Sequence, residues 1–113
     1  MLSIPGNTQI YLYGSPTDMR KSFRGLTTLV YQQLGRPEDG SYFVFINRRQ
    51  THVKILYSDG DGLAIWYKRL EEGRFTVPDA AGDKVEMDRR SLAMLLEGVT
   101  PLRVKKRFSL KTT

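Results

Sequence analysis

One continuous stretch decides the fold: Tyr42-Phe-Val-Phe-Ile-Asn-Arg-Arg-Gln-Thr-His-Val-Lys-Ile-Leu-Tyr57. Its first five residues are aromatic or β-branched, a composition typical of a buried strand, and we expect Phe43 and Phe45 to lie in the core. Polar residues 47–50 then connect to a second run, residues 51–57, in which Val53 and Ile55 alternate with His52 and Lys54. The stretch therefore predicts a β-hairpin with one strongly apolar face.

Upstream of this hairpin, the pattern predicts a strand and then a helix. Residues 9–13 alternate in polarity before the turn Gly14-Ser-Pro16. A helix over residues 19–34 is expected next, with Thr17 or Asp18 as its N-cap and Gly35 at its end. Apolar residues recur there every three or four positions and should face the core: Met19, Phe23, Leu26, Val30 and Leu34.

Downstream, Asp59-Gly-Asp-Gly62 predicts a type I′ turn. A third strand over residues 63–70 should follow it, although residues 63–72 could instead form a short helix. Residues 74–77 and 85–87 are expected to be further short strands. Asp88 should cap a second helix over residues 89–97 that turns three apolar side chains inward, Leu92, Leu95 and Leu96.

These elements predict an α+β fold, a small mostly antiparallel sheet with two packed helices and a basic C-terminal tail. A chain of 113 residues suits one domain, here residues 1–98, followed by a tail over residues 99–113. Residues 1–98 carry 13 basic and 12 acidic side chains, a net charge of +1, whereas the tail adds five cations and no acid to reach +6. Such a run is typical of a nucleic-acid contact, unless it serves only solubility.

Composition excludes several kinds of chemistry. The chain has no Cys and one imidazole, His52, which rules out disulfides, thiolate metal ligands and Cys–His catalysis. Asp59 and Asp61 lack the further ligands of a calcium loop, and no spacing gathers three carboxylates. We therefore expect no metal, no cofactor and no enzymatic activity, with an enzyme using those two aspartates as the least favoured alternative. No export signal or membrane-length apolar run is present, so a cytoplasmic location is expected.

Two groups of side chains are candidates for binding. Cations on the first helix, at the hairpin tip and in the tail are predicted to contact DNA phosphates, with Arg20 and Arg24 one helical turn apart, although a helix of this kind often has a merely solvated basic face. This DNA-binding set comprises Arg20, Lys21, Arg24, Arg48, Arg49, Arg103, Lys105, Lys106, Arg107 and Lys111. Aromatic residues that could be anchors for a partner protein form the second group: Trp66, Tyr67 and Phe75.

Particular strings in the chain resemble a known family. They are Thr17-Asp-Met-Arg-Lys-Ser-Phe23, Lys54-Ile-Leu-Tyr57, Trp66-Tyr-Lys-Arg-Leu70, Gly73-Arg-Phe75 and Leu95-Leu-Glu-Gly98. In this order they resemble the small accessory proteins of insertion-sequence-66 mobile elements, where the protein is the second reading frame, called TnpB. The chain departs from the family pattern at Arg24, Ser58 and Val77.

The resemblance implies a non-catalytic protein that acts in transposition beside a separate, larger transposase. The leading hypothesis is that it binds DNA at the element ends and assists the transposase. The alternative is a protein-interaction module that docks on the transposase through Trp66, Tyr67 and Phe75 without touching DNA. Its oligomeric state is not predicted.

Overall fold

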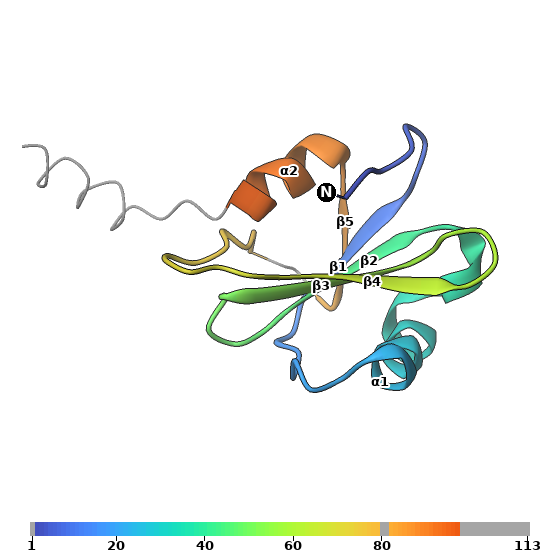
Figure 1. Ribbon diagram of the computed structural model, residues 1–113, viewed down its shortest axis with the longest axis horizontal. Coiled ribbons are helices and arrows are strands. Elements are labelled where there is room, and N and C mark those ends of the chain that lie inside the picture. Colours follow the sequence, from blue (N-terminus) through green and yellow to red (C-terminus); the bar gives the residue numbers. More distant parts are fainter. Residues whose placement is uncertain (1, 80–81, 98–113) are drawn as a thin grey trace, which may run out of the picture.

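The computed structural model describes residues 2–79 and 82–97, in which a sheet lies between two helices (Figure 1). The sheet has five strands in the order β4-β3-β2-β1-β5. Along the chain these are β1 (Ile10–Tyr13), β2 (Tyr42–Ile46), β3 (His52–Ser58), β4 (Leu63–Arg69) and β5 (Lys84–Met87). The helices are α1 (Phe23–Leu29), continued by a π-helical turn (Val30–Leu34), a short 3-10 turn (Pro37–Asp39) and α2 (Arg89–Glu97).

Strand pairing confirms the predicted α+β fold with a mostly antiparallel sheet. β1 and β2 run parallel, because α1 carries the chain from the end of β1 back to the start of β2. The pairs β2–β3, β3–β4 and β1–β5 are antiparallel. The strand predicted over residues 63–70 is therefore present as β4, and the helical alternative for this segment is wrong.

Each face of the sheet packs against one helix. On one face, α1 and the following π-helical turn bury Leu26, Val30 and Leu34 against Phe43 and Phe45, which confirms these two aromatic residues as core. On the other face, α2 buries Leu92 and Leu95 against the strand side chains that alternate with those of the first core. These include Ile10, Leu12, Val44, Val53 and Ile55. Side chains of alternate residues along a strand thus belong to different cores.

The predicted start of the first helix is wrong. Helix α1 begins at Phe23, not at residue 19, and Phe23 is 47% exposed rather than buried. The cause is Lys54 of β3, whose Nζ donates hydrogen bonds to the backbone oxygens of Met19, at 2.8 Å, and Lys21, at 2.6 Å. In a longer helix these oxygens would accept bonds from residues four positions later. The end predicted at Gly35, which has a φ of 136°, is confirmed.

Two smaller predictions differ from the structure. A type I′ turn needs positive φ at both central residues, but between β3 and β4 only Gly60, with φ of 103°, has it. No strand forms over residues 74–77; instead the Phe75 N–H donates to the Gln50 oxygen at 2.7 Å, and its ring enters the core.

The cap of α2 is as predicted, since Asp88 Oδ1 accepts the Ser91 N–H at 2.7 Å.

No helix in the described part of the chain is long and apolar enough to cross a membrane. The basic tail, residues 99–113, lies outside the described residues. Its role, and the division of the chain at residue 98, stay predictions.

Candidate nucleic-acid interface

A shallow cleft of about 480 Å³ lies between residues 16–19 and the β2–β3 turn. We call it the cationic cleft. Its lining comes from four places in the sequence: the segment before α1, the β2–β3 turn, the first residue of β3, and β4. The lining residues are Pro16, Thr17, Asp18, Met19, Asn47, Arg48, Arg49, His52 and Tyr67.

The hairpin tip is held in place by Asn47. Its Oδ1 accepts the backbone N–H groups of Thr51 and His52, each at 2.9 Å, and its Nδ2 donates to Thr51 Oγ1 at 3.1 Å. Arg48 and Arg49 occupy the centre of the turn and are exposed. Neither forms an ion pair with a described residue, so both guanidinium groups are free to bind an anion.

Tyr67 provides a partly exposed aromatic surface beside these cations. Its ring is 51% exposed, and Lys54 Nζ lies 4.7 Å from the ring centroid. The His52 ring lies 6.0 Å away, centroid to centroid. Because Lys54 is itself only 7% exposed and bonded to two backbone oxygens, it fixes the ring and the residue 19–21 segment relative to each other. A ring held in this way can stack against a nucleobase.

Two polar groups shape the wall formed by residues 16–19. Thr17 is buried; its N–H donates to the Ile46 oxygen at 2.9 Å, which ties this wall to β2. The Thr17 Oγ1 is buried and has no hydrogen-bond partner among the residues that the structure describes. Asp18 forms an ion pair with Arg20 at 2.7 Å, so its negative charge at the cleft is largely compensated. The side-chain hydrogen bond from Arg20, supported by the Arg20 backbone N–H, lowers the pKa of Asp18 from 3.8 to about 2.

We expect this ion pair to make stability depend on pH in the acid range. Folding favours the Asp18 carboxylate, so its contribution is complete above the unfolded pKa of about 3.8 and is lost as the pH falls through about 2. The free energies of unfolding of the native chain and Asp18→Asn should therefore differ most above pH 4 and converge towards pH 2. Urea unfolding of both proteins across this range measures the difference; an equal gap at pH 5 and pH 2 would contradict the assignment.

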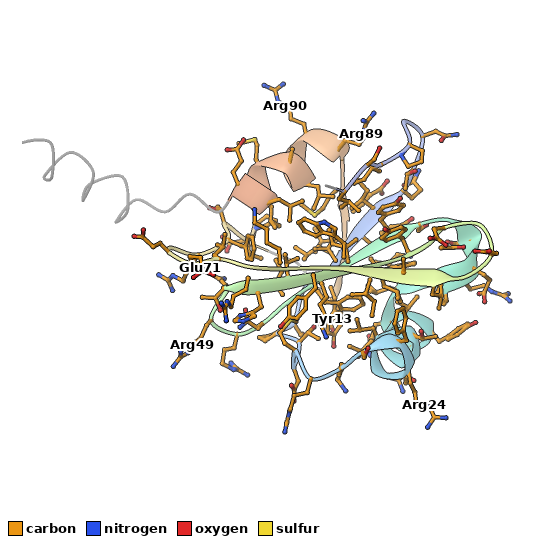
Figure 2. All side chains as sticks on the ribbon, in the orientation of Figure 1. Tyr13, Arg24, Arg49, Glu71, Arg89 and Arg90 are labelled. Carbon is orange, nitrogen blue, oxygen red and sulfur yellow. The ribbon has the colours of Figure 1, made fainter. Side chains whose placement is uncertain are left out.

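The predicted DNA-binding cations do not form one group. Arg20 and Lys21 precede α1 rather than lying on it, so the expected alignment of Arg20 with Arg24 is wrong. Arg20 is engaged with Asp18 beside the cleft, whereas Arg24 lies on α1. Figure 2 shows Arg24 and Arg49 on the same side of the sheet but at different ends. Of the predicted cations, only Arg48 and Arg49 line the cleft among the described residues, opposite residues 16–19. The tail cations Arg103, Lys105, Lys106, Arg107 and Lys111 lie outside the described residues.

The three aromatic residues predicted to form a protein-binding group are separated. Phe75 is 1% exposed and belongs to the core under α2, so its assignment as an exposed anchor is wrong. Trp66 is half-buried and faces α2, while Tyr67, the next residue of the strand, points to the opposite face and into the cationic cleft. Adjacent strand residues point to opposite faces, so these two cannot share a binding surface.

The predicted DNA-binding set left out Lys54 and His52, which the structure places beside and in this cleft. The available signal for Lys54 was a lysine in the middle of a strand, between the apolar residues Val53 and Ile55. A cation at such a position needs polar partners, since burying it alone is costly.

Within the described residues no cluster of three or more His, Asp or Glu side chains is arranged to hold a metal ion.

Comparison with known proteins identifies the family. The family model described as IS66 Orf2 like protein matches residues 8–106. Two proteins of Sinorhizobium fredii, the uncharacterized proteins y4hO and y4jC, are 36% and 31% identical to the chain over 100 residues; each alignment covers 88% of this chain and 87% or 86% of the relative. No solved structure matches the chain significantly. Since the family model and both relatives span most of its length, the chain belongs to the IS66 Orf2-like family and is an accessory protein of insertion-sequence-66 transposition.

Proposed function

We propose that the protein is a non-catalytic factor that binds DNA at the ends of its mobile element and assists the transposase there. The observation that carries the proposal is the cationic cleft, in which Arg48 and Arg49, which form no ion pair with any described residue, adjoin the exposed ring of Tyr67. Guanidinium groups contact phosphates, and an exposed aromatic ring stacks on bases that leave a duplex or belong to a single strand. The cleft therefore supports binding to DNA whose strands are partly separated, as well as to the backbone of a duplex.

The basic tail extends this proposal beyond the cleft. Its five cations, with no acid among residues 99–113, would add backbone contacts that are independent of sequence. In this arrangement the tail raises the affinity for DNA, and the cleft determines where the protein is positioned on the DNA. Residues 1–98 have a net charge of only +1. DNA binding should therefore depend on these local cations rather than on the electrostatic field of the protein as a whole.

We expect Arg48→Ala/Arg49→Ala to weaken binding to element-end DNA and to reduce the slope of log K against log[salt] by about 1.8, if each arginine neutralises one phosphate. Removing residues 99–113 should reduce the slope by up to about 4.5. The matched control is Arg89→Ala/Arg90→Ala, which removes the same charge from exposed positions on the opposite side of the sheet (Figure 2). Fluorescence anisotropy across a salt series, with element-end and scrambled duplexes, measures all four proteins. Equal slopes for the two double variants would contradict a role for the cleft.

A second candidate function is docking on the transposase without DNA contact. It is favoured by Trp66, which is half-buried at the groove beside α2 rather than enclosed in the core. Capture of the purified transposase in the absence of DNA, lost in a folded Trp66→Ala variant, would support it. If the full chain showed no affinity for DNA at low salt in the same samples, this function would replace the first.

A further inference from the structure

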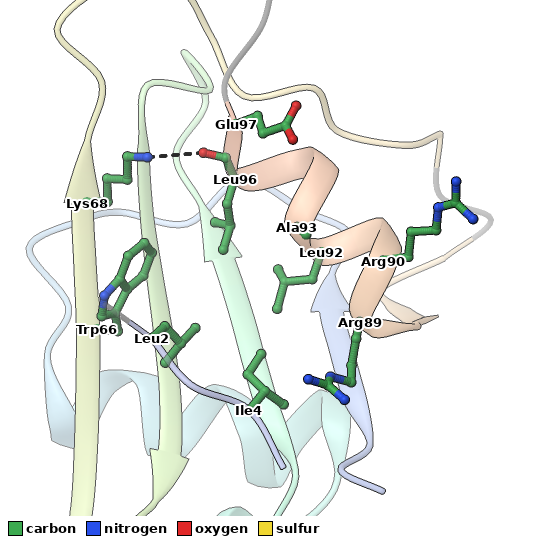
Figure 3. A pocket seen from close by; sticks show the side chains of 10 residues that line it. All are labelled: Leu2, Ile4, Trp66, Lys68, Arg89, Arg90, Leu92, Ala93, Leu96 and Glu97. Atoms are coloured by element: carbon green, nitrogen blue, oxygen red, sulfur yellow. Dashed lines mark hydrogen bonds between the residues drawn. The ribbon is translucent and has the colours of Figure 1, made fainter. Parts of the chain in front are cut away.

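A second groove, of about 590 Å³, lies on the face of the sheet opposite the cationic cleft (Figure 3). We call it the α2 groove. It runs between α2, the N-terminal segment and β4, and its apolar lining consists of Leu2, Ile4, Trp66, Leu92, Ala93 and Leu96. Figure 3 shows Leu2, Ile4, Trp66, Leu92 and Leu96 directed into this space from the three elements.

The apolar surface of the α2 groove is incompletely covered. Leu2, Ile4, Trp66 and Leu96 are each only half-buried, although all four pack against the core below. Beyond the groove, Met94 on the outer side of α2 is 63% exposed. Contiguous half-exposed apolar surface of this kind is typical of a binding site for another molecule.

Several hydrogen-bond donors surround this apolar surface, and three of them have no acceptor among the described residues. Arg89 and Arg90 are exposed at one end and form no ion pair with a described residue, and the Trp66 indole N–H has no partner in the described part of the chain. At the other end Lys68 Nζ donates to the Leu96 oxygen at 3.1 Å, and Glu97 is the one acid among the described lining residues. The groove therefore presents an excess of positive charge and a free indole donor.

We propose that the α2 groove binds an amphipathic helix of a partner protein. The apolar face of this helix would be flanked by carboxylates. Leu92 and Leu96 lie one turn apart on α2, so the apolar side chains of a second helix, spaced by three or four residues, can pack between them and Trp66. Carboxylates flanking that apolar face would meet Arg89 and Arg90. This proposal concerns a different face from the cationic cleft and stands whether or not the cleft binds DNA.

Charge disfavours the other occupants. The chain's own residues 99–113 follow α2 directly but carry five cations and no acid, so they would bring like charge to the groove. A second copy of the chain would bring its own arginines from an equivalent surface. Both would be repelled by Arg89 and Arg90, whereas an acidic helix is attracted.

Trp66 is the only tryptophan of the chain, so its fluorescence reports directly on the groove. Two helical peptides of about 15 residues serve as probes, with Leu on one face and either Glu or Lys beside it. The full chain should bind the Glu peptide saturably, with a blue shift of Trp66 emission. Arg89→Glu/Arg90→Glu should weaken this binding by about tenfold or more, whereas Arg48→Glu/Arg49→Glu, the same charge change on the opposite face, should have a much smaller effect.

A closely matched pair of single variants separates groove contact from general charge. Ala93 and Met94 are adjacent exposed residues of α2, but only Ala93 lines the groove. Ala93→Glu should abolish binding of the Glu peptide, and Met94→Glu should leave it nearly unchanged. The proposal is overturned if the Glu peptide gives no saturable change, or if the Lys peptide binds as tightly. It is equally overturned if a peptide of residues 99–113 competes with the Glu peptide, or if Trp66 emission shifts with protein concentration because the chain self-associates.

Discussion

Replacing Phe75 by Ala should lower the free energy of unfolding by about 3–5 kcal/mol, as is expected for truncation of a fully buried Phe side chain. Its ring is 1% exposed and packs in the core between the sheet and α2, so truncation leaves a cavity that the surrounding strands cannot fill. The total free energy of unfolding of a domain of this size is only about 5–15 kcal/mol. The variant should therefore unfold at a markedly lower urea concentration than the native chain.

Tyr67→Ala is the natural comparison, because it removes an aromatic ring that is 51% exposed. We expect it to cost about 1 kcal/mol or less, chiefly through the lost contact with Lys54. Urea unfolding followed by circular dichroism measures both variants. If Phe75→Ala were no less stable than Tyr67→Ala, the ring of Phe75 would not be a core side chain, and its prediction as an exposed anchor would have to be reconsidered.

Lys54→Met should also be strongly destabilising, lowering the free energy of unfolding by roughly 2–5 kcal/mol. The thioether chain can fill the space of the lysine stem, but the Met19 and Lys21 oxygens then lose hydrogen bonds of 2.8 and 2.6 Å from a charged donor. The residue 19–21 segment would be released from β3. DNA binding should weaken as well, since one wall of the cationic cleft and the support of Tyr67 are lost together.

Lys68→Met provides a matched control for this substitution. Lys68 is also a strand lysine whose Nζ donates to a backbone oxygen, but it makes one such bond, of 3.1 Å to Leu96, and lies on the opposite face. Its loss should cost about 0.5–1.5 kcal/mol and leave DNA binding unchanged. Should the two lysine variants prove equally stable, Lys54 would not be the residue that positions the segment before α1.

Local patterns in the sequence were enough to predict most of the elements. The aromatic and β-branched run of β2 and the cap at Asp88 depend on neighbours in the chain, so they could be recognised without the rest of the fold. The exposed arginines of the hairpin tip were predictable for the same reason, because a polar turn between two apolar strands must face solvent.

Features set by residues far apart in the chain were not predictable. The late start of α1 depends on Lys54, which lies 33 and 35 residues from the oxygens it binds. Burial of Phe75 depends on the bond between its N–H and Gln50, for which the segment shows no periodic pattern. The cationic cleft itself exists only because β4 pairs with β3 and places Tyr67 beside Lys54. Such contacts require the assembled sheet, whereas periodicity reports only which face of an element is apolar.

The most direct test of DNA binding at the cationic cleft is an amide NMR titration of the full-length chain with element-end DNA. The account predicts that the largest shift changes fall on residues 16–21, 47–54 and 67, in addition to any in the tail, and that Arg48→Ala/Arg49→Ala removes them from the body. Changes confined to α2 and residues 2–4, or to residues 99–113 alone, would contradict it.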